Sequence, residues 1–288
     1  MKCLSSYYNK EGQVAMEWHY TVAAQTDAGI AKSVNQDSLT VKVANMPYGE
    51  AAMAVLCDGM GGLEQGEVAS AVVVRAYEQW FLKELPLAIS RSGGSPAPSL
   101  IEKSWAKIAN DCNERLLDYG RDRKTTMGTT LTALLLFEGS YYIEHVGDCR
   151  AYRMSDSLME RLTQDQTYVA REVALGHMTP EQAKNDSRRN VLLQCIGTVK
   201  HVEPDFICGE YRAGDSFLLC SDGFRHELSE REMYDYCHLA VCDMDWSVSC
   251  RQENSRVMAG QLRYLIEQNK ARMEKDNISA VFLKAAGN

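Results

Sequence analysis

The sequence has no excess of basic residues and no long apolar run. Its 31 lysines and arginines are outnumbered by 39 acidic residues, giving a formal net charge of −8, which argues against a general nucleic-acid binder. The longest apolar run, Ala51 to Cys57, has seven residues, far fewer than the roughly 18 that a membrane span needs. With 45% hydrophobic residues, intrinsic disorder is excluded as well. We therefore expect a globular protein without a membrane span or a nucleic-acid partner.

The ten cysteines lack the Cys-x-x-Cys spacing of zinc ribbons and redox motifs, and they are too dispersed for a small disulfide scaffold. Cys57 and Cys220 end apolar runs, where a thiol behaves as a small buried hydrophobe. We therefore expect reduced cysteines and a cytoplasmic location. Residues 1–15 contain no apolar signal core and are expected to be a flexible leader, followed by one domain over residues 16–288.

Several common catalytic motifs are missing too. In the glycine cluster after Cys57, Glu64 stands where a dinucleotide-binding loop needs its last glycine. Gly66 is followed by Glu67, whereas a Walker loop requires lysine there. Neither the G-x-S-x-G elbow of serine hydrolases nor the H-E-x-x-H zinc motif occurs. These absences exclude the most familiar nucleotide-binding and hydrolase sites.

The predicted strands come in adjacent groups and the predicted helices in pairs. This order favours an α+β fold with antiparallel sheets over a βαβ fold. Ser-x-x-Glu capping boxes predict helix starts at Ser99 and Ser229, and residues 167–190 form a polar helical stretch with a break near Gly176. The segments expected to be strands are 17–24, 38–43, 51–57, 130–137, 141–146, 150–154, 206–211, 216–220 and 278–283.

Five aspartates stand at the ends of predicted strands: Asp37, Asp58, Asp148, Asp222 and Asp276. Taken singly, they are explained by turn chemistry, because Asp-Gly is a favoured turn pair. Taken together, carboxylates gathered at strand ends form an oxygen-rich site for Mg²⁺ or Mn²⁺. Two such ions, about 3.5 to 4 Å apart, can activate a water and clamp a phosphoryl group. The spacing alone leaves open whether the five side chains meet.

At this point the sequence resembles a known family, the metal-dependent protein serine/threonine phosphatases (PPM, or protein phosphatase 2C) in their compact bacterial form. The resemblance covers about residues 21–283 and follows the order of the family's motifs. The segments that carry it are TDAGIAKSVNQDS, AVLCDGMGGLEQGEVAS, TTMGTTLTALLL, YYIEHVGDCRAYR, LTQDQTYVAREVALGHMTPEQA, NVLLQCIG, FLLCSDGF and DNISAVFL.

The resemblance implies a role for each residue of the core site. Asp58 matches the aspartate that bridges two metal ions, with the Gly59 carbonyl on one of them. Asp222 and Asp276 match ligands of the other ion, so these two and Asp58 are the expected catalytic residues. Asp37 matches an acidic residue that acts through metal-bound water. The implied cofactors are two Mn²⁺ or Mg²⁺ ions.

The resemblance further implies a third-ion site at Asp148 with Asp222, and a flap beside the active site at residues 167–190. The implied fold is a β-sandwich of two antiparallel sheets flanked by pairs of helices. The implied reaction is hydrolysis of phosphoserine and phosphothreonine by direct attack of a metal-bridged water, without a phospho-enzyme. The implied partners are phosphorylated proteins and a cognate serine/threonine kinase, and we expect a monomer.

Two residues depart from the family pattern. Lys32 stands where many members have an arginine that grips the substrate phosphate; lysine keeps the charge but loses the two-point grip, so we expect weaker phosphate binding. The alternative is a solvated loop lysine. Met60 replaces a histidine that is assigned as general acid in many members, and a thioether cannot donate a proton. Aryl phosphates should therefore react more readily than alkyl phosphates.

Two other functions remain open. One is a catalytically inactive phosphatase fold that serves as a binding or regulatory module, although all five aspartate positions are filled. The other is a phosphohydrolase for small metabolites, which the acidic composition does not separate from a protein phosphatase.

Overall fold

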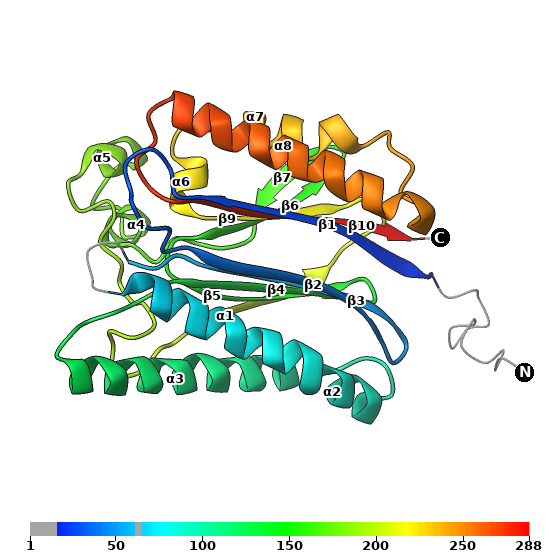
Figure 1. Ribbon diagram of the computed structural model, residues 1–288, viewed down its shortest axis with the longest axis horizontal. Helices are drawn as coiled ribbons and strands as arrows, with labels where there is room; N and C mark the ends of the chain where they lie inside the picture. Colours follow the sequence, from blue (N-terminus) through cyan, green and yellow to red (C-terminus); the bar gives the residue numbers. More distant parts are fainter. Residues whose placement is uncertain (1–15, 61–64, 288) are drawn as a thin grey trace, which may run out of the picture.

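Two five-stranded antiparallel sheets pack face to face in the computed structural model, which describes residues 16–60 and 65–287 (Figure 1). One sheet has the order β1-β10-β9-β6-β7 and the other β2-β3-β4-β5-β8. The strands are β1 (Trp18–Asp27), β2 (Ser38–Met46), β3 (Gly49–Cys57), β4 (Leu131–Phe137), β5 (Ser140–Val146), β6 (Arg150–Ser155), β7 (Leu158–Arg161), β8 (Asp205–Glu210), β9 (Ser216–Cys220) and β10 (Ile278–Gly287). The expected leader, residues 1–15, lies outside the described residues.

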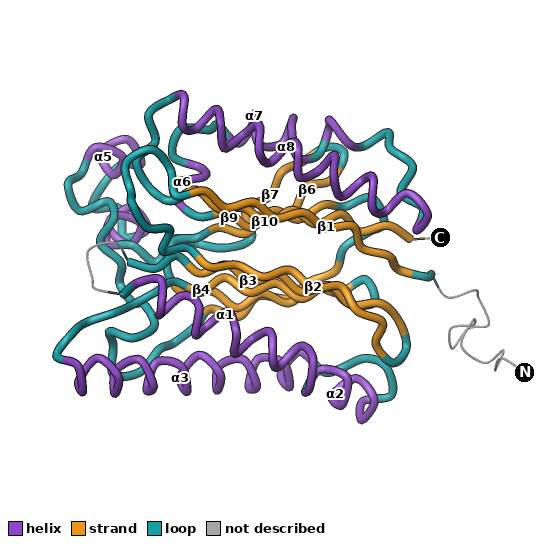
Figure 2. The backbone as a smooth tube through the Cα atoms, viewed as in Figure 1, coloured by secondary structure: helices purple, strands orange, loops and turns teal. Residues whose placement is uncertain are grey.

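Helices cover both outer faces of the sandwich, as Figure 2 shows. The helices α1, α2 and α3 lie over one sheet, and α7 and α8 lie over the other. Their bounds are α1 (Gly66–Lys83), α2 (Leu85–Ser92), α3 (Pro98–Arg123), α4 (Tyr168–Ala174), α5 (Pro180–Asn185), α6 (Asp222–Arg225), α7 (Glu230–Cys237) and α8 (Arg251–Ala271), with 3-10 turns η2 (Leu239–Val241) and η3 (Val248–Cys250). The predicted α+β sandwich with flanking helix pairs is confirmed. No helix in the described part of the chain is both long and apolar enough to cross a membrane.

The longest apolar run of the sequence, Ala51 to Cys57, lies in the strand β3. Ala54 and Leu56 face the core between the two sheets, whereas Met53 and Val55 face the helices α1 and α3. All four side chains are fully buried. A strand that is covered on both faces needs apolar residues at every position rather than at alternate ones. The run therefore marks a central strand of the layered fold.

One of the two predicted capping boxes is confirmed and the other is wrong. At Ser229, the hydroxyl accepts a hydrogen bond from the Glu232 backbone N–H, and the Glu232 carboxylate accepts one from the Ser229 backbone N–H. At Ser99 no such box forms, because α3 begins one residue earlier, at Pro98, with Ala97 as its N-cap. Proline suits the first helical position, since its fixed φ is helical and its missing N–H is not needed there.

Several short elements were not predicted from the sequence: α2, α6, β7 and the two 3-10 turns. The helix α2 follows α1 after a single residue, and the strand β7 is a four-residue edge strand that pairs with β6. Short exposed edges carry little apolar pattern, so their signal is weak. The predicted break in the 167–190 stretch is confirmed: α4 ends at Ala174, Gly176 adopts a left-handed conformation with φ +74°, and α5 begins at Pro180.

Candidate metal centre

Strand pairing brings the five predicted aspartates to one end of the sandwich. Ser38 pairs with Cys57, so Asp37 and Asp58, each one residue beyond, lie side by side at the end of one sheet. In the other sheet Ala280 pairs with Cys220. This register places the start of β10 beside the end of β9.

The remaining three aspartates occupy this same end. Asp222 begins α6 directly after β9, and Asp276 stands two residues before β10. Asp148 lies in the turn between β5 and β6. These two strands belong to different sheets, so this turn crosses from one sheet to the other at the end where the other aspartates lie.

Burial and mutual repulsion make this cluster electrostatically costly. Burial raises the pKa of Asp58 well above its usual value, and repulsion from Asp37, Asp222, Asp148 and Asp276 raises it further. Burial raises the pKa values of Asp37 and Asp148 to about 7, and repulsion from Asp222 adds to both shifts. Carboxyl groups that perturb one another in this way share a site. Removing the repulsion requires either protons or cations.

Several of these oxygens are ready to bind a cation. Both carboxylate oxygens of Asp37 and the Oδ1 atom of Asp222 are buried without a hydrogen-bond partner among the described residues. Buried polar atoms are normally satisfied, so unpartnered oxygens beside Asp58 fit a hard divalent ion. Within residues 16–60 and 65–287, no three acidic, histidine or cysteine side chains converge into a finished coordination shell.

The backbone of Asp58 is held firmly by two threonines. Its N–H donates to Thr130 Oγ1 at 2.9 Å. Its carbonyl accepts from the Thr130 N–H and from Thr129 Oγ1, both at 2.9 Å. The carboxylate of Asp58 thus extends from a fixed backbone rather than from a loose turn.

Gly59 is required at its position by close backbone packing. A Cβ atom there would lie 2.4 Å from the carbonyl oxygen of Gly66 and 2.5 Å from that of Gln36. The Gly59 N–H donates to the same Gln36 carbonyl at 3.1 Å. The start of α1 can approach Asp58 this closely only because residue 59 has no side chain.

Lys32 lies beside a predicted metal ligand. Its Nζ atom is 3.3 Å from Asp276 Oδ1, and the two side chains are 35% and 36% exposed. Lys32 is therefore neither buried nor a fully solvated loop lysine. It places a positive charge at an accessible edge of the aspartate cluster, since the Asp276 side chain is more exposed than those of Asp148 and Asp222.

Asn277 holds the loop that carries Lys32, and no sequence pattern predicted this role. Its Nδ2 atom donates to the carbonyls of Ala28 at 3.0 Å and Val34 at 3.2 Å. Its Oδ1 atom accepts from the Gln36 N–H at 2.9 Å. One buried amide thus fixes both ends of the 28–36 loop against β10.

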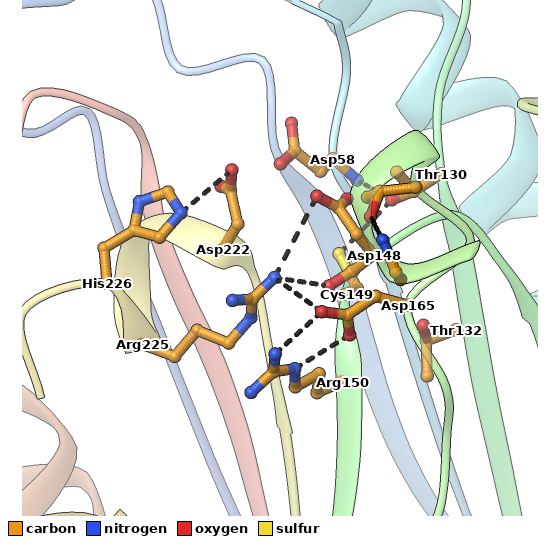
Figure 3. A network of polar contacts seen from close by, with 12 residues as sticks. Asp58, Thr130, Thr132, Asp148, Cys149, Arg150, Asp165, Asp222, Arg225 and His226 are labelled. Carbon is orange, nitrogen blue, oxygen red and sulfur yellow. Dashed lines mark hydrogen bonds and ion pairs between the residues drawn. The ribbon is translucent and has the colours of Figure 1, made fainter. Parts of the chain in front are cut away.

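A partly buried chain of charged residues, also not predicted, adjoins Asp148 (Figure 3). Arg150 donates two hydrogen bonds to Asp165, at 2.8 and 2.7 Å. Arg225 lies 3.7 Å from Asp165 Oδ2 and 3.9 Å from Asp148 Oδ2. Arg150 belongs to β6, Arg225 to α6 and Asp165 to the segment before the predicted flap. No local sequence pattern could therefore have linked these residues.

His226 completes the surroundings of Asp222. Its two ring nitrogens lie 3.6 Å from Asp222 Oδ2 and 3.2 Å from Glu274 Oε2. The imidazole therefore bridges the end of α6 to the segment before β10. This contact, too, was not predicted from the sequence.

The expected inert cysteines are found next to the site. Cys57 precedes Asp58 and Cys149 follows Asp148, and both are free and fully buried. Burial raises the pKa of both thiols well above the usual value. A thiol that stays protonated is a poor nucleophile, so neither side chain is equipped to attack a substrate.

Comparison with known proteins identifies the family. Residues 26–263 match the family described as Protein phosphatase 2C. The serine/threonine protein phosphatase PstP of Mycobacterium tuberculosis is 33% identical over 215 residues, which are 74% of this chain and 38% of PstP. The chain thus spans well under half the length of that relative.

Two solved structures resemble the whole described fold. The serine/threonine phosphatase Stp1 from Staphylococcus aureus matches with a TM-score of 0.74 and 26% identity, over 94% of this chain and 97% of Stp1. The catalytic domain of PstP in complex with two manganese ions matches with a TM-score of 0.71 and 26% identity, over 93% and 99% of the two chains. With the sandwich, the aspartate cluster and these similarities in agreement, the chain belongs to the protein phosphatase 2C family.

Proposed function

We propose that this chain hydrolyses phosphoserine and phosphothreonine in proteins with two Mn²⁺ or Mg²⁺ ions. Asp58 would lie between the ions, with the Gly59 carbonyl on one and Asp222 and Asp276 on the other. Asp37 would act through water. The observation that carries the proposal is the set of buried, unpartnered oxygens on Asp37 and Asp222 beside Asp58. The two manganese ions bound to the PstP catalytic domain support it.

Bound divalent ions would lower the pKa of a shared water and neutralise charge on the phosphoryl group. The protein's own residues prepare the site. The hydrogen bonds to Thr129 and Thr130 fix Asp58 before any ligand arrives. Lys32, 3.3 Å from Asp276, supplies a positive charge for the substrate phosphate.

The neighbouring side chains support direct attack by water. The protonated, buried thiols of Cys57 and Cys149 offer no nucleophile for a phospho-enzyme. Met60 has no proton to give to the leaving alkoxide, so that proton would come from water. Aryl phosphates, whose leaving groups need little protonation, should therefore be the easier substrates.

The wider proposal covers the organisation and setting of the chain. Residues 16–288 would form one catalytic domain, with residues 167–190 as a flap that helps to select substrates. The partners would be phosphorylated proteins and the kinase that phosphorylates them, and the domain would act as a monomer. The nine free cysteines among the described residues support a reducing compartment such as the cytoplasm.

The decisive test is hydrolysis of p-nitrophenyl phosphate and of a phosphothreonine peptide with Mn²⁺, with EDTA and Asp58→Asn as controls. We expect Mn²⁺-dependent turnover of both substrates, abolished by either control. No turnover with metal present would contradict the enzyme and favour a binding module. Turnover of the aryl phosphate alone, with no phosphopeptide or phosphoprotein accepted, would favour a small-molecule phosphohydrolase.

A further inference from the structure

Arg225 is a largely buried cation that contacts Asp148 of the aspartate cluster. Its side chain is 12% exposed. Its Nη2 atom donates to the main-chain carbonyl of Asp148 at 3.0 Å and lies 3.9 Å from the Asp148 carboxylate. Asp222, which begins the same short helix α6, also acts electrostatically on Arg225. The guanidinium therefore lies against the Asp148 and Asp222 side of the cluster.

The position of this guanidinium is fixed by further buried charges. Asp165 lies 3.7 Å from Arg225 Nη2 and also accepts hydrogen bonds from both Nε and Nη2 of Arg150. Arg150 and Asp165 are 19% and 15% exposed. A two-point arginine–carboxylate contact fixes orientation as well as distance. Arg225 is therefore held in place by Asp165 as well as by Asp148.

Charge divides the cluster into two unequal parts. On one side, Asp148 and Asp165 face two guanidinium groups, so their negative charges are already balanced. On the other side, Asp37 and Asp58 have no ion-pair partner among the described residues. Within the described part of the chain, Asp222 is ion-paired with His226, at 3.6 Å, which is charged only when protonated, and Asp276 with the partly exposed Lys32, at 3.3 Å.

We propose that Arg225 is a built-in cation that takes the place of a third divalent ion beside Asp148, so that this chain binds two ions rather than three. The inference rests on the function proposed above. An arginine stays protonated at all ordinary pH values, and its fixed charge opposes a dication at the same carboxylates. Arg225 is thus a positioning residue: its fixed positive charge lies against the Asp148 and Asp222 side of the cluster, while the two ions are left to Asp37, Asp58, Asp222 and Asp276.

The test is the number of Mn²⁺ ions bound per chain, measured by equilibrium dialysis with elemental analysis and independently by the loss of the free Mn²⁺ signal in electron paramagnetic resonance. We expect two ions in the wild type and three in Arg225→Gln, because the substitution removes the competing charge. Adding Asp148→Asn to that variant should return the count to two. Arg225→Lys, which keeps a cation, should stay at two.

Arg153→Gln is the matched control. Arg153 is a partly buried, ion-paired arginine on the same strand β6 as Arg150, but it contacts Asp215 and the Glu210 carbonyl instead. This variant should bind two ions.

Three ions in the wild type, or two in a folded Arg225→Gln, would overturn the inference and leave the proposed function intact. If Arg225→Gln does not fold, Asp148→Asn in the wild-type background decides. Two ions bound by that single variant support the inference, and loss of an ion relative to the wild type overturns it. No saturable Mn²⁺ binding by the wild type would overturn both the inference and the proposed function.

Discussion

Two regions of this molecule bury carboxyl groups, and the free-energy cost of that burial is offset differently in each. Beneath the helices α1 and α3, Glu144 is 1% exposed and accepts a hydrogen bond from the Tyr77 hydroxyl. Burial raises the pKa of Glu144 to about 8, so at neutral pH it carries a proton. At the sandwich end, Asp37 is also buried, and both Asp37 and Asp58 face other carboxylates. Neither carboxylate oxygen of Asp37 has a hydrogen-bond partner among the described residues.

The difference shows what distinguishes a structural buried acid from a candidate metal ligand. A single carboxyl group in an apolar layer is neutralised by one proton and one hydroxyl donor. Several carboxylates in one place repel one another, so every proton that is lost raises the cost for the rest. A divalent ion removes that repulsion, and it can be held by oxygens that have no other partner. Raised pKa values alone would not have separated the two regions.

The largest effect is expected for kcat when Asp58, in the aspartate cluster, is substituted. Asp58→Asn should lower kcat for p-nitrophenyl phosphate by more than the roughly 100-fold typical of residues that only support metal ligands. Glu144→Gln, an equally conservative change at the other buried acid, should leave kcat within about twofold, because no substrate or ion is expected there. Equal losses in the two variants would contradict the distinction.

The second effect is a pH dependence of stability that arises from Glu144. The folded protein keeps a proton that the unfolded chain releases above about pH 4.5, so stability should fall as the pH rises from about 4.5 to about 8. The slope from this group is at most about 1.4 kcal/mol per pH unit. Urea unfolding of wild type and Glu144→Gln with saturating Mn²⁺ isolates it. An unchanged slope in the variant would show that Glu144 does not hold the proton.

Added metal should stabilise the folded protein by binding at the aspartate cluster, independently of Glu144. At a Mn²⁺ concentration 100 times Kd, the free energy of unfolding should rise by about 2.7 kcal/mol. Glu144→Gln should show the same rise, whereas Asp37→Asn should show a smaller one, because Asp37 contributes two unpartnered oxygens. Thermal unfolding with and without EDTA measures both, and a full rise in Asp37→Asn would remove that residue from the site.

The smallest effect concerns the exposed edge of the cluster. Lys32→Arg should lower KM for a phosphothreonine peptide, because a guanidinium can grip a phosphate at two points. The gain should be at most about 1 kcal/mol, or up to about fivefold, since Lys32 and Asp276 are both over one-third exposed. The value of kcat should hardly change. An unchanged KM would favour the simpler interpretation of Lys32 as a surface lysine paired with Asp276.

Much of the fold could be predicted from local patterns. The apolar run of β3 and the capping box at Ser229 depend on residues that are close in sequence, so their signals survive without tertiary information. Ser99 shows the limit of such patterns: the same box spacing failed there because the preceding Pro98 could begin the helix instead. The edge strand β7 was not predicted because its four residues carry almost no apolar pattern.

The candidate site divides along the same line. The five aspartates at strand ends, their family and the oxygen chemistry that fits a divalent ion could be predicted from the sequence, because each of these depends on residue type and order along the chain. That Asn277 anchors the Lys32 loop and that Arg225 lies against Asp148 became known from the folded structure alone. These contacts join residues 77 or more positions apart, and such pairing is set by sheet register and layer packing rather than by any local pattern of side chains.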